Sequence, residues 1–580
     1  MLDVNGLRLR ISPSVAAAVT AITVLLPPTY ILLKRALRAH ILFYHTSLPD
    51  IPTLGSPVPE TQKKKHGTVV ICGGSIAGLL AARVCVDHFA RVIVVEPETS
   101  ALADADAAHM QQRQQLGKRE IVKDGVTYNT LTHNRSRVPQ YTAVHGYQAF
   151  FTLFLRQLFP NFDQRARTRG IRVNRDDMHY FLNGRLCRYP HQELAKAGKP
   201  DIESIFCSRR ALESLIRVLV KEDVPQIEYV NGTVTDLKLA SDNRTIDAAL
   251  VRPVGTNTKP TELACDLIID CTGNTQAGLK WLTQYDPRVN YCTLEWPAPP
   301  HFEENLRKID AGCYISADGS PKPVDLSQES VFIVWSPTSS DTDYRFFVGG
   351  RFEDGIVVFS AGGWDSEMPV NLDQLRTFAQ AANQDRRVPK YIYEIFDLLE
   401  EVEDQGVAYE AKVRSCSRIP YESVSDILPS NFIAFGDSNM RVNPRAGEGV
   451  NKCAMGATTL DGVLRRLPLG PHDRAFGSTF FSLLGSRTQT IWDGARLIDY
   501  SFESTTPIRG ETRDTGAFVR WYMKVAGRVA ERDPAVGSVL WHGAEFLGPF
   551  FDILAPGVFL KVLWEAMFPT KIEPDEPYFL

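Results

Sequence analysis

Residues 68–96 read TVVICGGSIAGLLAARVCVDHFARVIVVE, and this stretch decides the expected fold. It begins with a continuous apolar run at 68–72, which is typical of a buried parallel strand. A glycine turn follows, then a helical segment at 79–86 and a second apolar run at 92–95 that ends at Glu96. Strand, glycine turn, helix, strand and acid in this order form the βαβ unit that cradles a dinucleotide. The sequence therefore predicts an α/β fold with a dinucleotide site at this turn.

Each residue of the glycine turn has an expected task. Gly73 permits the tight turn, and Gly78 lets the helix pack closely on the strand. Gly74 and Ser75 lie between them, and Ser75, in place of the usual middle glycine, is small enough to let a phosphate approach. The pyrophosphate is expected on the amides of the helix N-terminus, where the helix dipole is positive. Glu96 is expected to accept hydrogen bonds from the ribose hydroxyls.

Length and composition narrow the class of protein. With 580 residues the chain is too long for one simple core, so two or three packed regions are expected. The net charge of -4 gives no reason to expect a nucleic-acid partner. The ten cysteines form no C-x-x-C pair and no Cys/His cluster at zinc spacing, so no metal site is predicted. They indicate free thiols in a reducing compartment.

The N-terminal segment 1–40 is expected to anchor the protein in a membrane. No charged residue occurs between Ile11 and Leu33, and a helix of about 20 apolar residues can span a bilayer. Basic residues at 34, 35 and 38 follow the apolar run and favour a cytosolic body. These features predict a single-pass membrane protein, for example of the endoplasmic reticulum. The Pro27-Pro28 pair leaves a kinked helix and a re-entrant hairpin as alternatives.

Two later motifs belong with the glycine turn. An apolar run at 266–271 ends in Thr272-Gly273, and another at 432–435 ends in Gly436-Asp437. A turn with the sequence Pro444-Arg445-Ala446-Gly447-Glu448-Gly449 follows, and a helical run begins at Val450.

With these motifs in this order, the chain resembles the flavoprotein monooxygenases of the para-hydroxybenzoate hydroxylase type (class A). The resemblance implies FAD bound to a Rossmann-like domain of the glutathione-reductase type. It implies that the glycine turn holds the ADP half and that Asp437 contacts the ribityl or pyrophosphate part. Arg209, at the start of a helix, is implied to lie near the diphosphate. The turn with Pro444, Gly447 and Gly449, and the helix from Val450, are implied to lie beside the flavin ring and to stabilise negative charge on it.

The resemblance also implies a division of the chain. An antiparallel β-sheet substrate domain and a helical C-terminal region are expected beside the FAD domain. The expected parts are the anchor at 1–40, a linker at 41–66, the FAD domain at 67–280 and 429–466, the substrate domain at 281–428, and the helical region at 467–580. Aromatic side chains that could line the substrate pocket are Tyr291, Trp296, Phe332 and Trp335.

A narrower resemblance concerns Arg137-Val138-Pro139-Gln140 and His145. These residues are similar to one branch of the FAD-binding monooxygenases, in which two histidines usually follow the Pro-Gln pair. Here Ala143 replaces the first, so a structural role for His145 competes with a catalytic one. No catalytic residue is assigned.

The function implied by the resemblance is an NAD(P)H- and O2-dependent monooxygenase. It would hydroxylate or epoxidise a lipophilic small molecule, as in secondary metabolism, and Baeyer-Villiger insertion stays open. No second glycine-rich βαβ unit is present for NAD(P)H, which suits a reductant that binds only transiently. The alternatives are a flavin reductase or dehydrogenase on the same fold and a non-catalytic binding protein that retains the fold. A flavin halogenase is disfavoured because no Trp-x-Trp-x-Ile-Pro stretch occurs.

Overall fold

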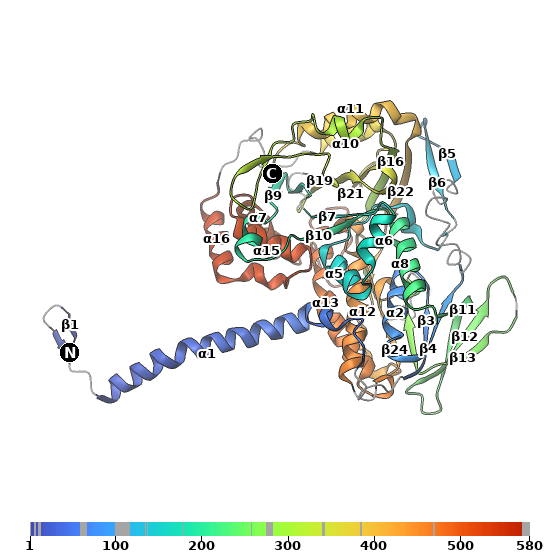
Figure 1. Ribbon diagram of the computed structural model, residues 1–580, viewed down its shortest axis with the longest axis horizontal. Coiled ribbons are helices and arrows are strands. Elements are labelled where there is room, and N and C mark those ends of the chain that lie inside the picture. Colours follow the sequence, from blue (N-terminus) through green and yellow to red (C-terminus); the bar gives the residue numbers. More distant parts are fainter. Residues whose placement is uncertain are drawn as a thin grey trace.

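Two seven-stranded sheets and the helices around them form the body of the protein (Figure 1). The computed structural model describes residues 2–4, 7–9, 13–58, 66–98, 117–133, 135, 137–176, 178–256, 258–273, 282–338, 343–382, 385–467 and 470–570. Within these residues, the predicted mixed α/β fold with multistranded sheets is confirmed.

The first sheet has the strand order β13-β12-β11-β4-β3-β14-β24. Its bounds are β3 (His66–Cys72), β4 (Phe89–Glu96), β11 (Glu228–Leu239), β12 (Ile246–Pro253), β13 (Thr261–Ala264), β14 (Leu267–Asp270) and β24 (Phe432–Ala434). Strands β11, β4, β3, β14 and β24 pair in parallel, and β12 and β13 add an antiparallel meander. The carboxyl ends of parallel strands meet at one edge, so the residues that follow β3, β4, β14 and β24 are brought together there.

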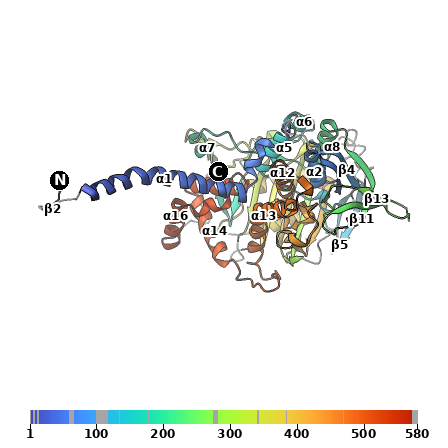
Figure 2. The same ribbon diagram turned by 90° about the horizontal axis from the view of Figure 1, so that it is seen from below.

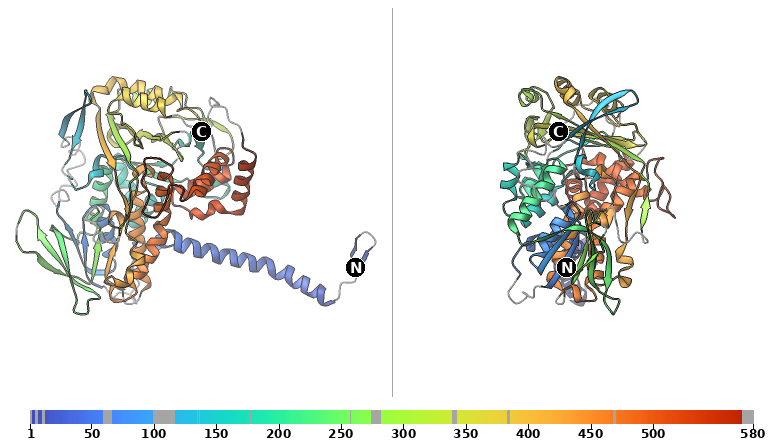
Figure 3. Two further views of the ribbon diagram at one scale, coloured as in Figure 1. Left: turned by 180° about the vertical axis from the view of Figure 1, so that it is seen from behind. Right: turned by 90° about the vertical axis from the view of Figure 1, so that its right-hand side faces the viewer.

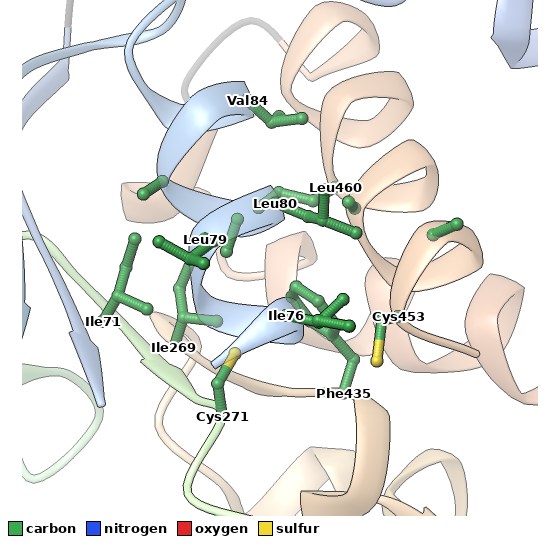
Figure 4. Close-up of a cluster of buried hydrophobic side chains, with 14 of the residues drawn as sticks. Ile71, Ile76, Leu79, Leu80, Val84, Ile269, Cys271, Phe435, Cys453 and Leu460 are labelled. Carbon is green, nitrogen blue, oxygen red and sulfur yellow. The ribbon is translucent and has the colours of Figure 1, made fainter. Parts of the chain in front are cut away.

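Helix α2 (Ile76–Cys85) packs between this sheet and helix α12 (Gly449–Arg466). Its apolar side chains other than Ala77 are buried, and Figure 4 shows Leu80 facing Leu460 of α12 while Leu79 lies over Ile71 and Ile269 of the sheet. Helix α8 (Arg209–Asp223) contacts α2, helix α5 (Ala149–Leu158) contacts α12, and helix α6 (Phe162–Thr168) contacts α8. This packing fixes the N-termini of both α2 and α12 near the edge where the parallel strands end.

The second sheet has the order β22-β16-β21-β20-β19-β8-β9. Its bounds are β8 (Tyr180–Leu182), β9 (Arg185–Cys187), β16 (Val289–Pro297), β19 (Val331–Ser336), β20 (Arg345–Arg351), β21 (Ile356–Trp364) and β22 (Val407–Val413). Helices α10 (Leu372–Ala381) and α11 (Lys390–Leu399) cover its outer face (Figure 1). Phe359 of β21 packs on Phe396 of α11 with a centroid distance of 5.0 Å.

The remaining elements include smaller sheets, the short helices α7 (His191–Lys196) and α9 (Phe302–Leu306), and the C-terminal helices. Helices α13 (Phe476–Asp499), α14 (Ala517–Ala530), α15 (Pro534–Ala544) and α16 (Pro556–Met567) form the C-terminal region. One small sheet has three strands, β15 (Thr283–Tyr285), β23 (Cys416–Arg418) and β25 (Met440–Arg441). The two-stranded sheets are β5 (Gly117–Lys123) with β6 (Val126–Thr132), β7 (Arg172–Arg175) with β10 (Glu203–Phe206), β17 (Cys313–Ile315) with β18 (Pro321–Pro323), and β1 (Leu2–Val4) with β2 (Leu7–Leu9).

The predicted membrane anchor is wrong. Among the helices that the structure describes, none has both the length and the apolar character that crossing a bilayer requires. The segment 1–40 instead contributes most of α1 (Pro13–His45), one continuous helix that projects from the body (Figures 1, 2 and 3). Its second half carries basic residues, and Arg38 forms an ion pair with Asp552 before α16. The single-pass localisation drawn from the apolar run is therefore corrected.

The segment after α1 is tied to the body by buried charges. Asp50, in the 3-10 helix η1 (Leu48–Thr53), is 5% exposed and accepts hydrogen bonds from Arg466 and Arg487 at 2.9 and 2.7 Å. Burial alone would raise the pKa of Asp50, but the two guanidinium groups lower it. Arg487 is 1% exposed, so Asp50 supplies the negative charge that its burial requires. Residues 59–65 of the expected linker lie outside the described residues.

Replacing Asp50 by alanine should lower the free energy of unfolding by about 3–5 kcal/mol, because Arg487 would remain buried without a counter-charge. Urea denaturation measures the change. Asp163→Ala is the matched control, since Asp163 pairs with Arg156 at the surface and its side chain is 43% exposed. The control should change stability by about 1 kcal/mol or less. Equal effects of the two substitutions would show that burial of Arg487 is not what makes Asp50 important.

Candidate functional site

The glycine turn brings the start of α2 against the end of β3. Gly73 has a φ of +104°, a left-handed conformation that favours glycine. A Cβ atom at Gly78 would lie 1.8 Å from the Gly73 carbonyl oxygen, so a side chain there would push α2 off the strand. Ser75 is the N-cap residue of α2, but its side chain does not cap the helix. The first-turn amides of α2 therefore face outward at the edge of the sheet, as an anion site requires.

Buried charged side chains surround the N-terminus of α2. Glu96 accepts a hydrogen bond from the Gly74 amide at 2.6 Å and lies 3.3 Å from Arg135. Arg209 donates to the Ser75 hydroxyl at 2.9 Å, and Ser75 donates to Glu213 at 3.0 Å. The structure thus brings the predicted residues Gly73, Gly74, Ser75, Gly78, Glu96 and Arg209 together at one edge of the first sheet.

Glu213 of α8 is the centre of this charge network. Its carboxylate accepts hydrogen bonds from Arg209 at 2.9 Å and from Arg135 at 3.1 Å, and it also pairs with Arg217. Burial alone would raise the pKa of Glu213, but the positive charges of Arg217, Arg209 and Arg135 lower it to about 2. Three arginines converge on this carboxylate, and Arg135 also pairs with Glu96 and Glu98 at 3.3 and 2.9 Å, so a network of buried ion pairs lies beside the α2 N-terminus.

Asp437 lies where β24 ends, in the 3-10 turn η9 (Gly436–Ser438). Its carboxylate accepts a hydrogen bond from Lys452 of α12 at 2.8 Å and faces the Gln140 amide at 3.4 Å. Burial raises the pKa of Asp437, but Lys452 more than offsets this and the pKa is lowered. The carboxylate is thus held ionised at the same edge as the glycine turn.

The turn from Pro444 to Gly449 closes this edge. Pro444 begins the 3-10 turn η10 (Pro444–Ala446), Gly447 has a φ of +70°, and α12 begins at Gly449. A Cβ atom at Gly447 would lie 2.8 Å from the Cα atom of Gly146, so two loops distant in sequence touch here. Gln148 fixes the contact by donating to the Ala446 carbonyl at 2.7 Å. Val450 is buried in the first turn of α12.

His145 lies on the loop that touches this turn. Its Nδ1 atom is 2.9 Å from the Ala143 carbonyl oxygen, and its ring stacks against Tyr147 with a centroid distance of 6.2 Å. Burial, followed by the charge of Arg209, lowers the pKa of His145 to about 4, so the imidazole is neutral near pH 7. The hydrogen bond to the backbone carbonyl fixes the orientation of this neutral ring within the loop.

A cavity of about 830 Å³ lies beside the turn. Its walls come from β16, β19, β20 and β21 of the second sheet, from the turn at 444–448, and from the C-terminal helices. Tyr291 and Trp335 line it as expected from the sequence, whereas Trp296 and Phe332 pack in the core of the second sheet. Most of the lining is apolar. Two of the four candidate aromatic residues therefore line the cavity, because strand residues alternate between the two faces of the sheet.

Comparisons with known proteins support the fold. The chain is 24% identical over 488 residues to Protein Rv3254 of Mycobacterium tuberculosis, covering 82% of this chain and 88% of that protein. A flavoprotein/dehydrogenase from Cytophaga hutchinsonii has a similar structure, with a TM-score of 0.50, 10% identity, and 87% of this chain and 98% of that chain covered. The flavin-dependent brominase Bmp2 has a TM-score of 0.48 at 12% identity, with 87% and 99% covered. No family model matches the chain. The structure from Cytophaga hutchinsonii thus confirms the expected likeness to flavoproteins at the level of the fold.

Several residues of the site belong to no sequence motif from which their place in the site could be predicted. Arg135, Glu213 and Lys452 contact predicted site residues, but each lies far in sequence from its partner or in an ordinary helical position. Glu448 lies inside a predicted motif, yet only the structure shows that it lines the cavity. Helical spacing alone links Glu213 to Arg209 and Arg217, which are four residues away on either side.

Replacing Glu213 by glutamine should destabilise the protein in a pH-dependent way. The pKa of Glu213 lies below the ordinary 4.5, so its ionised form stabilises the fold above about pH 4.5, and this contribution is lost as the pH falls toward 2. At pH 7 the loss should be about 3 kcal/mol. Urea unfolding of the native protein and the variant at pH 7, 5 and 4 measures it, with the surface substitution Glu228→Gln as control. A stability difference that grows toward acid pH would contradict the assignment.

Proposed function

We propose that this chain is an FAD-dependent monooxygenase that uses NAD(P)H and O2 to hydroxylate or epoxidise a lipophilic small molecule. The observation that carries the proposal is the large, mainly apolar cavity, whose wall includes the turn at 444–448. In the class that the sequence resembles, this turn lies beside the flavin ring. A cavity at that place would hold an apolar substrate where the ring reacts.

The described residues fit FAD. The parallel strands of the first sheet and α2 would form the Rossmann-like domain of the glutathione-reductase type that the resemblance implies, and the glycine turn leaves no room for side chains at Gly73 and Gly78. The outward amides of α2 and the side chain of Arg209 would hold the pyrophosphate. Glu96 would bind the ribose of the ADP half, and Asp437 would bind the ribityl or pyrophosphate part.

FAD, when bound, supplies the redox chemistry with NAD(P)H and oxygen. The protein's own groups have other tasks. The turn with Pro444, Gly447 and Gly449 would position the ring, and the amides of the first turn of α12, near Val450, would stabilise negative charge on it. The apolar strand side chains would exclude water from the reacting centre. No described side chain is assigned as an acid or base for this step.

A flavin reductase or dehydrogenase on the same fold is the second candidate. It is favoured by the likeness in fold to the flavoprotein/dehydrogenase from Cytophaga hutchinsonii. Both candidates require bound flavin and a reductant, and they differ in the fate of oxygen. Incorporation of labelled oxygen into a product identifies the monooxygenase, and reduction of a substrate double bond without incorporation identifies the reductase.

The absorption spectrum of the purified protein tests the proposal first. Oxidised flavin has two visible absorption bands that belong to the cofactor itself. We expect these bands, and we expect them to bleach when NADPH is added without oxygen and to return when air is admitted. A protein that stays colourless after reconstitution with FAD would leave only a non-catalytic binding role.

Replacing Asp437 by alanine should lower the FAD content of the purified protein, because the Gly-Asp turn would lose its carboxylate while Lys452 stayed buried beside it. The loss of a hydrogen bond to an ionised group predicts at least about tenfold weaker binding. The ratio of flavin to protein absorbance after dialysis gives the result. Asp426→Ala, an exposed position near the same strand, should keep the full content. Normal flavin content in Asp437→Ala would remove Asp437 from the cofactor site.

A further inference from the structure

Glu448 contributes a carboxyl group to the cavity wall. It is the N-cap residue of α12, its side chain lines the cavity, and its buried Oε2 atom has no hydrogen-bond partner among the described residues. A buried polar atom without a partner costs free energy, so such atoms are rare unless a ligand completes the site.

The charged neighbours of Glu448 already have other partners. Arg445, in the same turn, donates to the Ser336 hydroxyl, and Lys452 donates to Asp437 and to the Met440 carbonyl. Tyr180 of β8 is the third titratable group close enough to influence it. None of the three forms a hydrogen bond or ion pair with Glu448 within the described part of the chain. The carboxyl group therefore remains available to a molecule in the cavity.

Other lining groups show what kind of molecule fits. Trp335 and Trp541 line the same cavity, and their indole N–H groups also lack partners in the described structure. The rest of the lining is mainly apolar. The positive charges of Arg445 and Lys452 beside Glu448 disfavour a cationic ligand. The complementary ligand is a neutral, largely apolar molecule that offers a hydrogen-bond donor at one end.

We propose that Glu448 is a specificity-determining residue that accepts a hydrogen bond from a hydroxyl group of an otherwise apolar substrate, such as a phenol, enol or alcohol. The assignment rests on the proposed function in one respect, namely that this cavity holds the substrate. The substrate class is therefore defined by a hydroxyl group that can donate a hydrogen bond to Glu448.

The ionisation of Glu448 should make the ligand preference of the cavity depend on pH. Burial raises the pKa of Glu448 to about 7, against the lowering effect of Arg445 and Lys452. The carboxyl group therefore gains charge between pH 6 and pH 8, and an ionised acceptor binds a hydroxyl donor more strongly than a neutral one. A role that is only structural would not make ligand preference follow this ionisation.

Equilibrium dialysis of the FAD-loaded protein with two probes tests the proposal. The probes are 2-naphthol and 2-methoxynaphthalene, which share the apolar rings and differ in the hydroxyl donor. The naphthol stays neutral at pH 6 and 8, because phenols ionise near pH 10. At pH 8 the native protein should prefer naphthol by about tenfold, the size expected for a hydrogen bond to an ionised group, and at pH 6 by about threefold.

Two variants complete the test. Glu448→Gln keeps the shape and an acceptor but cannot ionise, so its preference should be about threefold or less at both pH values. Glu422→Gln is the matched control, because Glu422 lines the same cavity but pairs with Arg418, and it should keep the native pattern. Equal affinities for the two probes in the native protein, no saturable binding of either, or a pH-dependent preference that survives in Glu448→Gln would overturn the proposal.

Flavin absorbance, recorded for every preparation, separates this proposal from the proposed function. Probe binding needs no turnover, so a native protein with flavin but without the naphthol preference refutes only the role of Glu448. A native protein that binds no flavin refutes the proposed function, whatever the probes do.

Discussion

The contact between α2 and the end of β3 is the constraint on which the rest of the site depends. Because a Cβ atom at Gly78 would lie 1.8 Å from the Gly73 carbonyl oxygen, the helix can reach this position only without a side chain there. The close approach places the α2 amides at the carboxyl edge of the first sheet. It also leaves the opposite face of α2 free to pack on α12, whose N-terminus then lies at the same edge (Figure 4).

Charge balance stabilises this arrangement. The guanidinium groups of Arg135, Arg209 and Arg217 lie in a small buried volume beside the N-terminus of α2, and the carboxylates of Glu213, Glu96 and Glu98 supply their counter-charges. Without these carboxylates the buried arginines would repel one another. The same principle holds η1 in place through Asp50 and Arg487, in a part of the protein without a proposed chemical role.

The cavity is assembled from three regions of the chain. The second sheet supplies its apolar wall, the turn before α12 supplies Glu448, and the C-terminal helices supply further lining residues such as Trp541. The 3-10 helix η12 (Phe550–Leu554), between α15 and α16, contacts α1 through the pair of Asp552 with Arg38 and the ring contact of Phe551 with His45 at 5.0 Å. The N-terminal segment is therefore joined to the region that borders the cavity.

Local sequence determined the elements that obey strict rules of spacing and backbone geometry. The βαβ unit at 68–96, the strands before Thr272 and Asp437, and the turn at 444–449 could be identified because left-handed or crowded backbone positions require glycine, and buried parallel strands require apolar runs. The apolar run that ends at Leu33 led to the wrong prediction of a single-pass membrane segment. Hydropathy along the chain does not reveal that the same helix continues into a basic half that contacts the body. Only the tertiary structure decided that Arg135 meets Glu96 and Glu213, that Lys452 meets Asp437, and which faces of the aromatic strands meet the cavity. It also decided which carboxyl group of the cavity has an oxygen atom without a partner among the described residues. Those features depend on how separate elements pack, as for Arg135 and Glu213, which are 78 positions apart, and no local pattern encodes such contacts.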